Sequence, residues 1–209
     1  MEFRACDEFD GGLGWIAEER FVRTSHALAA DGGVWLVDPV DTPELEATVG
    51  ALGEVRGVIQ LLDRHGRDSA ELARRFGVPH ARVPFDTVVP GAPFEFVRVV
   101  DVRGWREAAL WWPERRVLVC ADALGTVPFF CAGDEPVGVH PLLRLVPPRA
   151  LARFHPEHLL CGHGEGLHGP EATSALHVAL ATSRGRSPRL ALRAAGGMLG
   201  GARRLVRRS

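Results

Sequence analysis

Short apolar runs alternate with polar or glycine-containing segments along the whole chain, which is the pattern of an α/β protein. The runs are too short for buried helices and are rich in Val, Leu and Phe, so they predict strands. These strands are expected at residues 3–9, 21–27, 34–37, 55–62, 94–102, 108–112, 116–119 and 158–161. Two groups of strands, each followed by helices, indicate a layered α/β sandwich.

Helix-start signals follow several of these strands. Thr42 at an N-cap and Pro43 at the first helical position predict a helix that ends near Gly53. The other helices are expected at residues 68–77, 147–154 and 171–181.

Polar side chains gather directly after three of the expected strands. Residues 63–68 read Asp-Arg-His-Gly-Arg-Asp, residues 120–122 read Cys-Ala-Asp, and residues 161–164 read Cys-Gly-His-Gly. Open α/β sheets place their sites at the carboxyl ends of strands, so these segments are the candidate functional site.

The order and context of the three segments resemble the metallo-β-lactamase superfamily. His65 matches the second His of that family's H-x-H-x-D-H loop, Asp122 its bridging Asp, and His163 the final His within a Gly-His-Gly. The resemblance runs from about residue 20 to residue 182. It implies a four-layer αβ/βα sandwich of metallo-β-lactamase type.

The family's ligand pattern is only partly kept. Asp63 stands in place of the first His, Arg67 in place of the Asp, Asp68 in place of the last His of the loop, and Trp105 where the middle His is expected. The usual two-zinc centre therefore cannot be assembled. The remaining candidate metal ligands are His65, Asp68, Asp122 and His163, and the candidate catalytic residues are Asp63, His65 and Asp68.

Two interpretations of this altered site stay open. An oxygen-rich ligand set suits at most one divalent ion, which we expect to be manganese, iron or zinc. Alternatively no metal binds, because Arg67 takes the place of a cation and pairs with Asp122 or Asp63, while Trp105 fills the vacated metal position.

These interpretations imply different functions. With a metal, the protein is a divergent hydrolase of a small ester, thioester or phosphoester. Without one, it is a non-catalytic scaffold or ligand-binding protein in which Arg67 and Trp105 replace the metal centre. The sequence does not decide whether the protein is an enzyme.

Composition indicates one domain with a basic tail. A chain of 209 residues, 46% of them hydrophobic, is long enough for one sizeable core, which we place in residues 1–183. Residues 184–209 carry 8 of the 25 Arg and no acid, whereas all 26 acids lie before them. The tail is expected to be flexible and to make a weak contact with a membrane surface; no specific nucleic-acid partner is expected.

Location and origin follow from simple counts. Four scattered Cys, no signal-peptide pattern and no apolar stretch of about 18 residues predict a cytoplasmic protein. The basic residues are all Arg, with no Lys, as in proteins of bacteria with GC-rich genomes.

Overall fold

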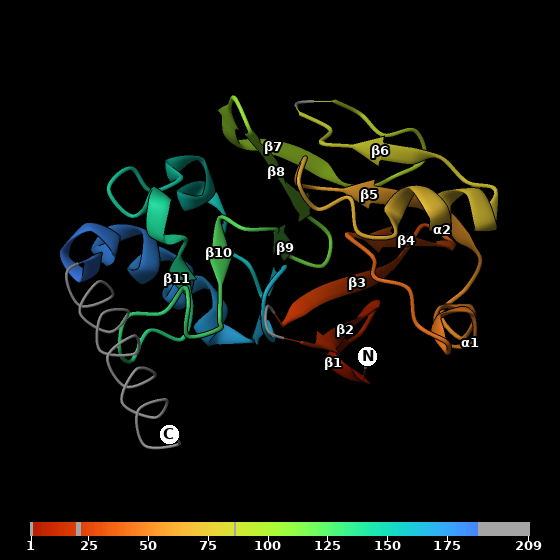
Figure 1. Ribbon diagram of the computed structural model, residues 1–209, viewed down its shortest axis with the longest axis horizontal. Coiled ribbons are helices and arrows are strands. Elements are labelled where there is room, and N and C mark those ends of the chain that lie inside the picture. Colours follow the sequence, from red (N-terminus) through yellow and green to blue (C-terminus); the bar gives the residue numbers. More distant parts are fainter. Residues whose placement is uncertain (1, 20–21, 86, 188–209) are drawn as a thin grey trace, which may run out of the picture.

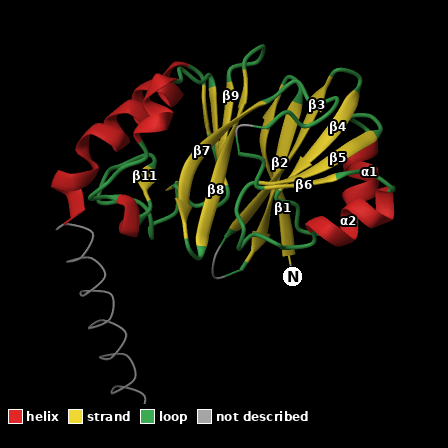
Figure 2. Cartoon of the chain, turned by 90° about the horizontal axis from the view of Figure 1, so that it is seen from above, coloured by secondary structure: helices red, strands yellow, loops and turns green. Residues whose placement is uncertain are grey.

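Two β-sheets lie face to face at the centre of the molecule, as seen in a computed structural model that describes residues 2–19, 22–85 and 87–187 (Figure 1). The N-terminal sheet has six strands in the order β1-β2-β3-β4-β5-β6, and the second sheet has five in the order β13-β12-β9-β8-β7. Helices cover the outer face of each sheet (Figure 2). The four-layer sandwich expected from the sequence is therefore confirmed.

The strand bounds agree closely with the expected segments. The N-terminal sheet contains β1 (Glu2–Phe9), β2 (Gly12–Glu18), β3 (Arg23–Ala30), β4 (Gly33–Val37), β5 (Val55–Gln60) and β6 (His80–Arg82). The second sheet contains β7 (Glu95–Val102), β8 (Trp105–Trp112), β9 (Val117–Cys120), β12 (His158–Cys161) and β13 (Leu167–His168). A separate pair consists of β10 (Leu124–Gly125) and β11 (Gly138–Val139).

The helices are α1 (Leu45–Gly50) and α2 (Ser69–Phe76), the short 3₁₀ helices η1 (Pro141–Leu143) and η2 (Arg149–Arg153), and a helix whose described part covers residues 170–187. The segment expected as a helix at 147–154 is thus only the 3₁₀ helix η2. The expected end of the domain at Ser183 falls inside the last helix, and the rest of the tail, residues 188–209, lies outside the described residues.

Strand β2 is the longest strand that the sequence pattern missed, because its glycines favour a turn; the short strands β6, β10, β11 and β13 were not expected either. Gly12 and Gly14 instead lie within the strand. Side chains of β1 pack closely over both positions and leave little room for a Cβ atom. A Cβ atom on Gly12 would lie 2.5 Å from the Phe9 ring. Glycine is therefore needed here for packing and not for a turn.

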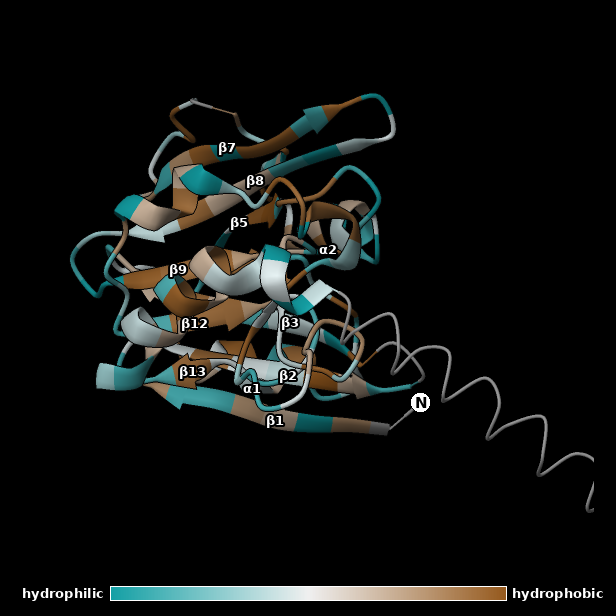
Figure 3. Ribbon diagram, turned by 90° about the vertical axis from the view of Figure 1, so that its left-hand side faces the viewer, coloured by the Kyte–Doolittle hydropathy of each residue, from teal (hydrophilic) through white to brown (hydrophobic). Residues whose placement is uncertain are grey.

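Three apolar interfaces join the four layers. Between the sheets, Trp35 and Leu62 pack in one cluster with Leu110 and Trp112. Under α1 and α2, Leu45, Val49 and Leu72 pack on the N-terminal sheet, and under the last helix Leu176 packs with Leu118 and Leu159. The hydropathy colouring shows the same pattern, with brown central strands and a more polar β1 at the edge (Figure 3).

Two pairs of parallel strands set the position of the candidate site. Strands β4 and β5 run parallel, as do β9 and β12, where Cys120 is the partner of Cys161. The polar segments that follow these strands consequently emerge at one edge. Isolated bridges between Arg23 and His163, and between Leu62 and Glu107, connect the two sheets there. Within the described residues, no helix combines the length and the hydropathy that a membrane span requires.

Candidate metal centre

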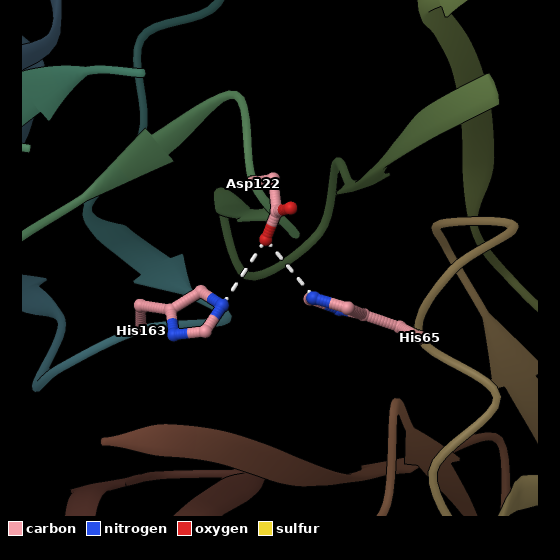
Figure 4. Close-up of side chains that lie close together, drawn as sticks. All are labelled: His65, Asp122 and His163. Atoms are coloured by element: carbon pink, nitrogen blue, oxygen red, sulfur yellow. Dashed lines mark ion pairs between the residues drawn. The ribbon is translucent and has the colours of Figure 1, made fainter. Parts of the chain in front are cut away.

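Three of the expected ligands come together where the segments after β5, β9 and β12 meet. His65 Nε2 lies 2.9 Å from Asp122 Oδ1, and His163 Nε2 lies 3.1 Å from the same oxygen. Candidate ligand atoms of the three residues all lie within 4.8 Å of one another. Figure 4 shows both imidazoles directed at the carboxylate of Asp122. One oxygen atom is therefore shared between two ring nitrogens.

The chemistry of this cluster fits a cation. Asp122 Oδ1 is buried and makes no hydrogen bond of ordinary geometry with the described residues. His65 Nδ1 lies 3.1 Å from Asp38 Oδ2, and a proton shared there leaves Nε2 of the neutral ring as a lone pair facing Asp122. A carboxylate that orients a ligating imidazole in this way is typical of metal sites. A lone pair facing a carboxylate oxygen requires a proton or a metal ion between them.

Charges within the cluster stabilise one another. Burial works to raise the pKa of Asp122, but the imidazoles of His163 and His65 outweigh it and hold that pKa well below its usual range. Burial and the Arg67 guanidinium work to lower the pKa of His65, yet Asp122 and Asp38 raise it overall. The carboxylate is thus anionic, and in the absence of a metal a proton is favoured on His65.

Glu107, which the sequence reasoning did not single out, supports the turn that carries Asp122. Its Oε1 accepts hydrogen bonds from the backbone amides of Ala121, Asp122 and Ala123, at 3.1, 3.0 and 2.8 Å. Trp105 Nε1 donates to the other oxygen at 3.0 Å. Burial, with the charge of Asp122 adding to it, raises the pKa of Glu107 to about 7. Glu107 directly precedes the strand expected at residues 108–112, and nothing in the local sequence distinguished it from an exposed acid.

Among the described residues Arg67 pairs with no carboxylate, so the expectation that it pairs with Asp122 or Asp63 is wrong. Its guanidinium donates to the carbonyl oxygens of Thr24, Asp38 and Gly162, at 2.5, 2.7 and 3.0 Å. The backbone at Arg67 has φ of 41°, in the left-handed region that non-glycine residues adopt uncommonly. Burial lowers the pKa of Arg67. Arg67 therefore connects β3, the end of β4 and the segment after β12 through hydrogen bonds.

The two remaining candidates of the first loop lie outside the cluster. Asp68 Oδ2 accepts a hydrogen bond from the backbone amide of Asp41 at 2.8 Å. Asp63 makes its described hydrogen bonds through its backbone, and its Oδ1 is buried without a partner among the described residues. Neither carboxylate belongs to the group formed by His65, Asp122 and His163.

Arg64 and His140 line the same region. Arg64 Nη2 lies 3.3 Å from Asp122 Oδ2, and its guanidinium stacks 4.7 Å above the Trp105 ring while remaining 46% exposed. His140 packs edge-on against Trp105 at 4.7 Å, and its Nδ1 accepts from the Leu142 amide. Burial lowers the pKa of His140 to about 4, so it is a neutral imidazole at pH 7.

Comparison with known proteins identifies the fold. No family model and no curated protein matches the sequence. Among solved structures, a metallo-β-lactamase from Pontibacter korlensis aligns with a TM-score of 0.62 over 86% of this chain and 99% of its own, at 11% identity.

Two further structures were solved with metal in place. FIM-1 from Pseudomonas aeruginosa, in a mono-zinc form, aligns with a TM-score of 0.52 over 88% of this chain and 97% of its own, at 10% identity. TTHA1623, in a di-iron-bound form, aligns with a TM-score of 0.51 over 74% of this chain and 94% of its own, at 18% identity. The resemblance drawn from the sequence is confirmed, and the chain has the metallo-β-lactamase fold.

Proposed function

We propose that the protein is a metal-dependent hydrolase of a small ester, thioester or phosphoester, with one manganese, iron or zinc ion held by His65, Asp122 and His163. The observation that carries the proposal is the buried Oδ1 of Asp122, which faces two imidazole nitrogens and makes no hydrogen bond of ordinary geometry with the described residues. The mono-zinc and di-iron forms of two proteins with this fold add support.

The chain's own residues prepare this centre. Three protein ligands leave an open position for substrate, and a divalent ion held there supplies Lewis-acid polarisation of the scissile group. Asp38 fixes the orientation of His65, and Glu107 fixes the turn that carries Asp122. Arg64, half exposed at the mouth, is placed to pair with an anionic part of the substrate.

Of the proposed catalytic residues, Asp63 keeps an uncommitted carboxylate oxygen. The carboxylate of Asp68 is engaged with the Asp41 amide, and His65 faces Asp122 as a ligand. Asp63 is therefore the candidate base that we retain, and its replacement by Asn is the direct test of that role.

A second candidate function rests on the same cluster. His65 lies between two carboxylates, Asp38 and Asp122, which raise its pKa, so a proton is able to take the place of the ion. Such a centre is stable without metal and would serve a scaffold or a ligand-binding protein, with Arg67 as the permanent buried cation behind it. Metal content separates the two functions.

Elemental analysis of protein purified without chelator is the test. We expect close to one manganese, iron or zinc per chain, and loss of this metal in His163→Ala. His155→Ala removes an exposed imidazole elsewhere and is the matched control, so it should keep the metal. Metal far below one per chain, even after soaking with each ion, would overturn the hydrolase and leave the scaffold. Full metal without hydrolysis of model esters, thioesters and phosphoesters would remove the enzymatic part alone.

A further inference from the structure

Three large aliphatic side chains project into solvent within a single short segment. Leu142, Leu145 and Val146 are 76%, 68% and 74% exposed, in η1 and the turn that follows it. Scattered exposed aliphatic residues need no explanation, but three within five positions form a patch. We call Leu142, Leu145 and Val146 the aliphatic patch.

Two guanidinium groups without carboxylate partners lie beside the aliphatic patch. Arg184, on the last helix, donates from Nε to the carbonyl oxygen of Leu145 at 2.7 Å. Arg149 and Arg184 line a hollow of about 390 Å³ whose apolar wall includes Leu180 and Pro147. Within the described part of the chain, neither Arg149 nor Arg184 forms an ion pair, whereas the exposed Arg4, Arg56 and Arg75 each do.

The remaining Arg-rich sequence begins next to this surface. The helix that carries Arg184 is described to residue 187, and the 22 residues beyond it contain six Arg and no acid. The body of the protein is acidic, since all 26 acids lie before Arg184. Positive charge is thus concentrated in the sequence that begins at Arg184, whose guanidinium contacts the aliphatic patch.

We infer that the aliphatic patch, Arg149, Arg184 and the Arg-rich C-terminal segment together dock on an anionic lipid membrane. Aliphatic side chains gain free energy by entering the acyl boundary of a bilayer, and each Arg near an anionic surface adds electrostatic attraction. Nucleic acid would use the Arg residues but not the aliphatic patch, because phosphate contacts gain nothing from exposed Leu and Val. The combination therefore favours lipid.

Docking in this way would place the candidate metal centre at the membrane surface. His140, which caps η1, contacts the Trp105 ring, and the 58% exposed Phe129 packs edge-on against His140 at 5.5 Å. His140 consequently links η1, which carries Leu142 of the aliphatic patch, to the mouth of the centre. This inference goes beyond the proposed hydrolysis and does not depend on metal binding.

Co-sedimentation of the full-length protein with vesicles tests the inference. We expect binding to vesicles of phosphatidylglycerol and phosphatidylcholine, weak or no binding to phosphatidylcholine alone, and weakening by salt. The triple variant L142S/L145S/V146S should bind the anionic vesicles at least about tenfold more weakly, because its buried apolar area on the membrane is lost. R203Q/R204Q/R207Q/R208Q should weaken binding by a similar factor.

Val88→Ser is the matched control, because Val88 is 82% exposed in the connection between β6 and β7, outside the aliphatic patch. It should bind like the unaltered protein, and circular dichroism of all variants should be unchanged. Equal binding of the triple variant and the unaltered protein would overturn the inference. A second outcome would also overturn it: the unaltered protein binds duplex DNA, the Arg variant does not, and neither protein binds vesicles.

Discussion

Two buried carboxylates, Asp122 and Asp7, invite comparison because each lies beside two histidines. Asp122 belongs to the candidate metal centre, whereas Asp7 lies in β1, an edge strand of the N-terminal sheet. The neighbours of Asp122 are His65 and His163, and those of Asp7 are His26 and His168. For both acids, burial works to raise the pKa and the imidazoles outweigh it, so both pKa values lie well below the usual range.

The two acids differ in what the protein supplies to their oxygens. Asp7 Oδ1 accepts hydrogen bonds from the Gly166 amide at 2.6 Å and from His168 Nε2 at 3.1 Å. Asp122 Oδ1 has two nitrogens at similar distances but no hydrogen bond of ordinary geometry among the described residues. A carboxylate oxygen satisfied by an amide and an imidazole is structural, whereas one that lies between two imidazole nitrogens without a hydrogen bond of ordinary geometry is prepared for a cation.

The largest expected difference between the two acids is in the free energy of unfolding. Asp7→Ala should lower the free energy of unfolding by about 2–4 kcal/mol, because a buried amide and an imidazole lose a charged acceptor. Asp122→Ala, measured without metal, should cost only about 1 kcal/mol, since the Arg64 hydrogen bond that is lost is half exposed and both imidazoles are able to become neutral once the carboxylate is gone. Urea unfolding of both variants measures the difference. Equal losses would mean that Asp122 is as structural as Asp7.

A second, smaller effect appears in the dependence on pH. The folded pKa of Asp7 is lowered, so its contribution to stability is present above the unfolded pKa of about 3.9 and is lost as pH falls below that value. Asp7→Asn should therefore flatten the loss of stability below about pH 4 without changing its slope near neutrality. Thermal unfolding between pH 2 and 7 tests this. An unaltered acid limb would show that Asp7 titrates normally in the folded protein.

The smallest effect should come from Arg64. Its pairing with Asp122 at 3.3 Å is monodentate, and the Arg64 side chain is 46% exposed. Exposed pairs of this kind contribute about 0–1 kcal/mol, so Arg64→Gln should leave stability nearly unchanged. If Arg64 binds an anionic part of the substrate, the same variant should raise KM several-fold with kcat less affected. A loss of several kcal/mol in stability would assign Arg64 to the fold.

Local pattern predicted a layered α/β sandwich and placed His65, Asp122 and His163 directly after short apolar strands, and the family resemblance added the four layers and singled out these three residues. Neither was sufficient for side-chain partners fixed by tertiary packing. Asp68 shares the loop of His65, yet its carboxylate serves the Asp41 amide. Glu107 is a single acid in an apolar stretch and is fully buried in β8, and only the packing of β8 against the Asp122 turn reveals its three amide partners.

Arg67 also has a consequence for the order of folding. It bonds the carbonyl oxygens of Thr24 and of Gly162, which is 95 positions away in the chain, so its hydrogen bonds span both sheets. Contacts of such sequence separation are made only once the intervening chain has been closed into a loop, at a cost in entropy. The cluster in front of Arg67 then exists only in the completed molecule. An ion bound there would bind the native state and not the unfolded chain. It would therefore raise the free energy of unfolding of the protein.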